Sequence, residues 1–219
     1  MPDGRDRSGM LPAPMRMRLR LLVFLFFAAA AASALSAASA EAQEGPRAPL
    51  HYKLSSLGSV LRWELPATAH TVRGNVGSYH GTIDAEPGPE GWKIQSKIAV
   101  AADSMTTGNK KRDRVMREKV LETGQHPEIV FEATEVSADL SRFRPGQQFS
   151  AKVNGNLTVR GKSLPIQLPV DVYVFPDHVV LSGSFPIHWK EYGMQDPSFG
   201  IVRVKEPMNV AFRLRAVLQ

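Results

Sequence analysis

Short stretches of alternating apolar and polar side chains run through most of this chain, from residue 57 to the C-terminus. An alternation with a period of two is typical of a β-strand that has one buried face and one solvent face. Turns rich in proline and glycine separate the stretches, for example at 87–89 and 160–162. The pattern therefore predicts strands over the ranges 61–65, 92–100, 149–160, 166–174, 179–187 and 210–216.

One segment interrupts this alternation with a dense set of lysines and arginines, and it predicts a short helix near residues 109–122. Thr107 or Asn109 can cap its start, and Gly124 can end it. The charged face is either an ordinary solvated surface or a basic patch at the mouth of the fold, facing phosphate or lipid headgroups. The residues alone favour the solvated surface. The expected inner stripe consists of Val115, Met116, Lys119 and Val120.

Strands that each bury one face require one enclosed interior, so the fold class is all-β. Both a two-sheet sandwich and a closed barrel satisfy this requirement, and the pattern does not decide between them. A barrel of about eight antiparallel strands has a lumen that can hold one small ligand. The candidate inner face lines either such a lumen or a filled core. It consists of Leu61, Trp63, Leu65, Ile94, Ile98, Val100, Val153, Leu157, Leu168, Val170, Phe185, Ile187, Phe212 and Leu214.

Residues 1–42 have the order of a secretory signal peptide. An uncleaved membrane anchor is the less favoured alternative, because the alanine- and serine-rich second half makes a poor spanning helix. Three arginines between 16 and 20 precede an apolar run over 21–32, and small residues then lead to cleavage sites after Ala40 or Ala42. Met15 or Met17 is a plausible true start, because the preceding residues do not resemble the start of a signal peptide. The sequence thus predicts one exported domain over 43–219, located in the periplasm or outside the cell.

The composition narrows the classes of function. The chain has no cysteine, so it forms no disulfide and performs no thiol chemistry. Its net charge of +6 does not indicate nucleic-acid binding, although it favours contact with an anionic membrane. The histidines lack the spacing of metal ligands, so no metal site is predicted. No nucleophile motif or phosphate-binding loop is present, and we expect no enzymatic activity.

Three blocks of residues resemble the YceI-like family over about residues 57–217. The entry motif of many relatives is missing around 54–63, so ligand contacts that they make there are not transferred. The blocks are Thr107-Gly108-Asn109 with Arg112-Asp113 leading to His126-Pro127-x-Ile129-x-Phe131, then Val153-x-Gly155-x-Leu157-Thr158-Val159-x-Gly161, then Trp189-x-x-Tyr192-Gly193-Met194-x-Asp196-Pro197-Ser198.

The resemblance implies an antiparallel, lipocalin-like β-barrel of about eight strands with one short helix. It also implies an apolar lumen that binds a polyisoprenoid lipid, either quinone-like or a polyprenol, with no cofactor required. Asn109, Arg112 and Asp113 would form a motif at the mouth. Arg112 and Asp113 would contact the headgroup or form a salt bridge that pins the helix, and we favour the salt bridge. We expect transient membrane contact and a monomer or homodimer.

Two other classes of function stay open at this point. A stress-related or protein-interaction barrel would have a filled core and an exposed aromatic patch around residues 189–198. A hydrolase would need a serine, a histidine and an acid that converge in one pocket.

Overall fold

The computed structural model of the protein describes residues 48–68, 70–89, 91–198 and 200–219. The predicted signal peptide, residues 1–42, lies outside the described residues. None of the helices in the described part of the chain is long and apolar enough to cross a membrane.

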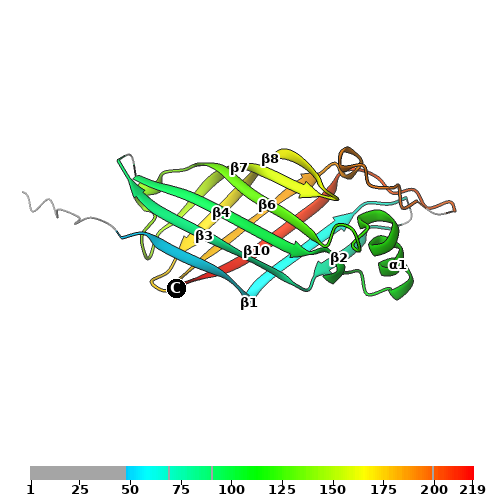
Figure 1. The fold of residues 1–219 in the computed structure, drawn as a ribbon, viewed down its shortest axis with the longest axis horizontal. Helices are drawn as coiled ribbons and strands as arrows, with labels where there is room; N and C mark the ends of the chain where they lie inside the picture. The colour runs from blue at the N-terminus through cyan, green and yellow to red at the C-terminus, as the bar shows by residue number, and fades with distance from the viewer. Residues whose placement is uncertain (1–47, 69, 90, 199) are drawn as a thin grey trace, which may run out of the picture. The chain divides into compact units, whose positions relative to one another are not determined.

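Ten antiparallel strands form one sheet that closes on itself (Figure 1). Strand β1 pairs with β3 on one side and with β10 on the other, so the sheet is a barrel and not a sandwich. Strands β2 and β5 lie outside the ring, which therefore has eight strands, as predicted. The strands are β1 (Leu50–Leu65), β2 (Val72–Val76), β3 (Tyr79–Gly88), β4 (Gly91–Ala101), β5 (Met105–Thr106), β6 (Glu128–Ser137), β7 (Gln148–Val159), β8 (Lys162–Val174), β9 (His178–Ile187) and β10 (Met208–Leu218).

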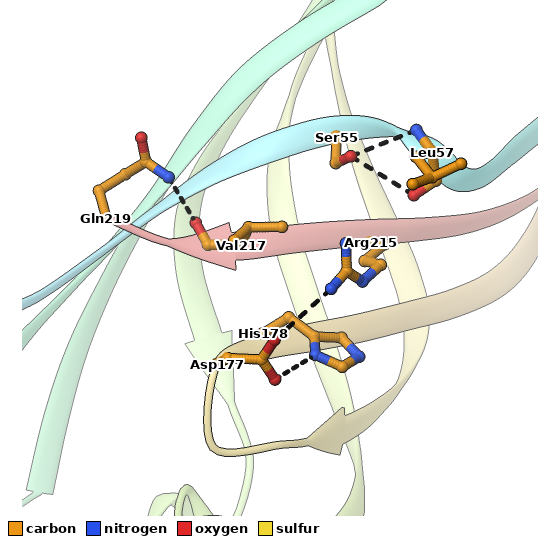
Figure 2. Close-up of polar contacts among 7 residues, drawn as sticks. All are labelled: Ser55, Leu57, Asp177, His178, Arg215, Val217 and Gln219. Carbon is orange, nitrogen blue, oxygen red and sulfur yellow. Dashed lines mark hydrogen bonds and ion pairs between the residues drawn. The ribbon is translucent and has the colours of Figure 1, made fainter.

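Strand β1 is long, and its two halves pair with different neighbouring strands. Its first half pairs with β3, and its second half pairs with β2, which extends the wall at one end of the barrel. Between the halves a bulge interrupts the register with β10, between Ser55 and Val60. The Ser55 hydroxyl accepts a hydrogen bond from the Leu57 N–H at 3.2 Å (Figure 2). The sequence analysis missed the first half of β1, although Leu50, Tyr52 and Leu54 alternate with polar residues before the bulge.

The predicted helix is present as α1 (Lys110–Val115), which continues into a π-helical turn, η2 (Met116–Leu121). Asn109 caps it, since its side chain accepts hydrogen bonds from the N–H groups of Lys111 and Arg112, both at 3.1 Å. The predicted bounds near 109–122 are confirmed, but Glu122 and not Gly124 ends the helix, since the chain adopts the left-handed conformation there, with φ of 51°. An ion pair of 2.5 Å between Glu122 and Arg160 holds that residue in place.

Three short 3₁₀ segments complete the fold: η1 (Ala102–Ser104), η3 (Leu140–Arg142) and η4 (Trp189–Tyr192). Helix α1 and the long loop between β9 and β10 lie at the same end of the barrel (Figure 1). We call this end the mouth. The interior holds two apolar clusters, one around Trp63 and Leu121 and one around Phe149 and Val170.

Candidate functional site

A cavity of about 960 Å³ occupies the interior of the barrel. All eight strands of the ring contribute side chains to its wall, and nearly all of these side chains are apolar. This follows from the period-two alternation, because successive residues of a strand point to opposite sides of the sheet. A cavity of this size and lining has the character of a small-molecule site.

The structure places all fourteen predicted inner-face residues on the wall of this one cavity. Residues of β3 and β6 were missed, because Ile83 stands alone in a polar stretch and no strand was predicted over β6. Phe149 and Ala151 also line the cavity, and their place on the same face as Val153 could have identified them. The inner stripe expected of the helix lines the cavity as well, through Val115, Met116, Lys119 and Val120.

Aromatic side chains gather at the end of the barrel away from the helix. Phe143 follows η3 in the connection between β6 and β7 and lines the cavity. Its ring packs edge-on against Tyr52 and Trp92, with centroid distances of 6.2 Å and 5.6 Å. Burial raises the pKa of the Tyr52 hydroxyl. Of these three aromatic residues, Phe143 lines the cavity, and the other two pack behind it.

One part of the wall lacks a continuous ladder. Strands β4 and β6 pair only from Lys97 to Ala101 of β4, opposite Glu128 to Glu132 of β6. A second cavity of about 520 Å³ lies between the two strands beyond this ladder. It shares four lining residues with the large cavity, namely Ile94, Ser96, Ala133 and Val136. Along this stretch the two cavities are separated by side chains and not by main-chain hydrogen bonds between β4 and β6.

The predicted mouth motif is divided between two roles. Asn109 and Arg112 line the large cavity, whereas Asp113 does not. Asp113 is only 4% exposed, and it accepts hydrogen bonds from the Thr106 hydroxyl at 2.7 Å, the Thr107 N–H at 2.8 Å and the Thr107 hydroxyl. Burial alone would raise the pKa of this carboxyl, but these hydrogen bonds outweigh it, and the pKa lies below its ordinary value.

The expected salt bridge between Arg112 and Asp113 is absent from the described contacts of both residues. The Arg112 Nε instead donates to the Thr107 hydroxyl at 2.8 Å, and the same hydroxyl donates to Asp113. The residue pair does pin the helix to the strand before it, as the favoured alternative required, but it does so through a threonine. Asp113 is thus a buried anchor of the helix at the mouth and does not line the cavity.

Arg160 anchors the other end of the helix. It occupies the turn between β7 and β8 with a φ of 50°, and its guanidinium binds the Glu122 carboxylate and the Gly193 carbonyl oxygen. Helix η2 and segment η4 are therefore joined through one side chain. Asp113 and Arg160 together hold the helix over the cavity from both ends.

Charged groups on the cavity wall are confined to the mouth, and most are cationic. Arg62, Lys111, Arg112 and Lys119 line it there, beside His70 and the carboxylate of Asp196. Hydrogen bonds from Ser198 hold the pKa of Asp196 below its ordinary value, so this group stays ionised at neutral pH. The field at the mouth therefore favours anionic or electron-rich groups.

The histidines lie on the surface or in hydrogen-bonded pairs. Asp177 bridges His178 at 2.7 Å and Arg215 at 3.7 Å on the outer wall (Figure 2). The hydrogen bond from His178 is the main cause of the lowered pKa of Asp177. Within the described residues no three His, Asp or Glu side chains could share a metal ion, and no hydrogen bond joins a serine to a histidine.

The family model for the YceI-like domain matches residues 52–216. The chain belongs to the YceI-like family. This match covers more than half of the chain and extends from β1 to β10. The three motif blocks fall within the matched range, so the predicted membership is confirmed. No curated protein sequence matches the chain.

Solved structures of low sequence identity share the fold of this YceI-like domain. A polyisoprenoid-binding domain from Saccharophagus degradans, implicated in plant cell wall breakdown, is 17% identical with a TM-score of 0.63, over 78% of this chain and 99% of that one. BcnA of Burkholderia cenocepacia is 16% identical with a TM-score of 0.57, over 72% and 95%. The YceI protein of Campylobacter jejuni is 17% identical with a TM-score of 0.55, over 68% and 85%.

Proposed function

We propose that the protein is an exported carrier that holds a polyisoprenoid lipid, quinone-like or a polyprenol, in the barrel and acts by binding alone. The observation that carries this proposal is the apolar cavity of about 960 Å³ to which all eight strands contribute. Each buried methylene contributes about 0.8 kcal/mol, so several isoprene units gain tight binding from burial alone. No cofactor is required for this role.

Two further observations support the proposal. The Saccharophagus degradans domain that shares this fold is described as polyisoprenoid-binding. The predicted signal peptide would deliver the protein to the periplasm or the cell exterior, where a hydrophobic lipid needs an apolar shelter between membranes. The family is one of binding domains, and we extend that character to this chain.

We also propose that the mouth contacts an anionic membrane transiently while lipid enters or leaves. Ile201 is 94% exposed on the loop between β9 and β10, whose neighbouring residues Val202 and Val204 line the cavity. Lys111 and Lys119 of the helix lie at the same mouth. An exposed apolar tip beside basic side chains is the chemistry that binds a bilayer surface.

The alternative of an interaction barrel without lipid has less support. It required an exposed aromatic patch in the block from 189 to 198, but Trp189 and Tyr192 are both buried. It also required a filled core, whereas the described interior is hollow.

The carrier proposal is tested by placing a charged side chain on the cavity wall. Leu157→Arg and Ile98→Arg each place a cation on the cavity wall and should abolish uptake of a prenylated quinone or a polyprenol. Asn156→Arg and Gln95→Arg are matched controls, because these neighbours are exposed on the same two strands and should leave binding unchanged. Native mass spectrometry of the exported protein, followed by organic extraction, identifies the bound lipid. Folded cavity variants that still bind lipid would refute the proposal.

A further inference from the structure

The helical segment at the mouth, α1 with η2, divides its charged side chains between two faces. The cavity face consists of the residues that line the large cavity at helical spacing, namely Lys111, Arg112, Val115, Met116, Lys119 and Val120. The outer face lines a separate surface groove and consists of Lys110, Asp113, Arg114, Arg117 and Glu118. Both acids of the segment therefore lie on the outer face, and the cavity face carries three cations and no acid.

The cations of the cavity face lack a counter-charge within the described structure. Among the residues that it describes, none of these three side chains forms an ion pair with a carboxylate. Asp196 is the carboxylate that lines the cavity at the mouth, but the cations that lower its pKa are Lys190 and Arg203, both from its own connection between β9 and β10. Glu122, at the end of the helix, is paired with Arg160.

Arg112 is held in position on this face. Its Nε donates to the Thr107 hydroxyl at 2.8 Å, and its Nη2 donates to the Thr107 carbonyl oxygen at 3.3 Å. Its Nη1 atom has no hydrogen-bond partner among the described residues and is not fully buried, so it remains accessible to a ligand. A guanidinium that is fixed in this way binds a phosphate oxygen in a defined orientation. Lys111 and Lys119 are exposed, and their flexible ammonium groups add charge without losing their hydration.

We propose that the cavity face of the helix binds the anionic head of the isoprenoid, and that the ligand is a polyprenol that carries a phosphate. This inference rests on the proposed carrier function and narrows its ligand class. A phosphate at the mouth neutralises three like charges that otherwise repel one another. A quinone ring or a free hydroxyl is neutral and gains less from the same field.

The apolar residues of the cavity face suit the other part of such a ligand. Val115, Met116 and Val120 line the cavity between the cations, and Met116 packs in the apolar cluster around Leu121. The first isoprene units would therefore contact apolar side chains while the phosphate contacts the cations at the rim. Burial of the chain gives affinity, and the head selects phosphate esters over neutral isoprenoids with the same chain.

The experiment compares farnesyl monophosphate with farnesol, which has the same hydrocarbon chain and a neutral head. Isothermal titration of the exported protein at low salt should show that the phosphate ester binds about tenfold more tightly, or ~1.4 kcal/mol, and added salt should reduce this ratio. Equal affinities at low salt would overturn the proposal. Inorganic phosphate alone should give no measurable binding. If it bound as tightly as farnesyl monophosphate, the cations would form a site for free phosphate and the proposal would fail.

Substitutions on the two faces separate direct contact from net charge. Arg112→Gln and Lys119→Gln should each weaken binding of farnesyl monophosphate about three- to tenfold and leave farnesol binding unchanged. Lys119→Gln keeps the test valid if the loss of the Arg112 contacts to Thr107 impairs folding. Lys110→Gln and Arg114→Gln are matched controls, because they remove the same charge from the outer face and should leave both affinities unchanged. Equal weakening by substitutions on both faces would overturn the proposal.

Vesicles of phosphatidylglycerol distinguish a bound head from a membrane surface. If the cavity-face substitutions weakened co-sedimentation with these vesicles but left farnesyl monophosphate binding unchanged, the cations would serve membrane contact alone and the proposal would be refuted. Failure of the unmodified protein to bind farnesyl monophosphate, farnesol, the prenylated quinone or a longer polyprenol would overturn the carrier function itself.

Discussion

Removal of the Asp113 carboxylate should release the start of the helix from the barrel. Its oxygens accept three hydrogen bonds from Thr106 and Thr107, and one of the donors is a main-chain N–H. Hydrogen bonds to a charged group contribute about 1.5–3 kcal/mol each in favourable cases, but they are not additive within one cluster. We therefore expect Asp113→Ala to lower the free energy of unfolding by about 2–4 kcal/mol.

Urea denaturation of the purified protein measures this change. The midpoint should fall while the slope with denaturant stays constant, since the surface exposed on unfolding is nearly unchanged. Glu118→Ala is the matched control, because Glu118 is an exposed acid of the same helical segment and its loss should cost less than about 0.5 kcal/mol. Equal effects of the two substitutions would refute the anchoring role of Asp113.

The pH dependence gives an independent check. The folded-state pKa of Asp113 lies below the ordinary value of about 3.9. The carboxylate therefore stabilises the fold above that value, and this stability is lost as the pH falls through the folded pKa. Asp113→Ala should show a smaller loss of stability between neutral pH and pH values below about 4. If the variant lost as much stability at acid pH as the unmodified protein, protonation of Asp113 would not be the cause of that loss.

Three further substitutions address other parts of the molecule. Gly74→Ala forces a methyl group into the ring of Trp63 and should destabilise the fold by about 1–3 kcal/mol in thermal or urea unfolding. Gly124→Ala is the control, because its methyl group would contact no other atom and should leave the stability unchanged. Arg160→Ala removes the tie at the end of the helix and should speed amide hydrogen exchange over 116–123, with the strands of the ring unaffected. Ile201→Ser should weaken co-sedimentation with anionic vesicles, and added salt should weaken the binding of the unmodified protein.

The sequence predicted the interior face of the barrel well, because strand geometry alone decides it. Once a stretch such as 149–160 is a strand, every second side chain must share a face, and Val153 and Leu157 follow without knowledge of the neighbours. Ring closure was not predictable in this way. It depends on the pairing of β1 with β10, between residues 145 to 166 positions apart, where the pattern carries no register information.

Local chemistry at the helix was only partly predictable. Asn109 is a good cap in any sequence, so its role followed from residue type. The anchoring of Asp113 by threonines was not visible, because spacing shows which groups are close but not which partner a carboxylate selects. The position of the helix end was predicted, but the role of Glu122 was missed for a similar reason. This left-handed residue is stabilised by Arg160, which lies 38 positions further along the chain.

Whether an apolar face packs or remains hollow depends on distances across the barrel and not on the residues of the face. The same Leu, Val and Phe side chains would suit a filled core, so sequence reasoning had to leave both outcomes open. In an eight-stranded ring the lumen is wide enough that opposite walls can meet or fail to meet, depending on side-chain length. Here the small side chains of Ala133 and Ala151 line the wall along with the bulky ones, and a cavity of about 960 Å³ remains.

An apolar cavity without a ligand forfeits the packing contacts of its lining. That loss is recovered when a hydrocarbon chain occupies the space, so bound lipid should raise the melting temperature of the protein in proportion to the length of chain that the cavity admits.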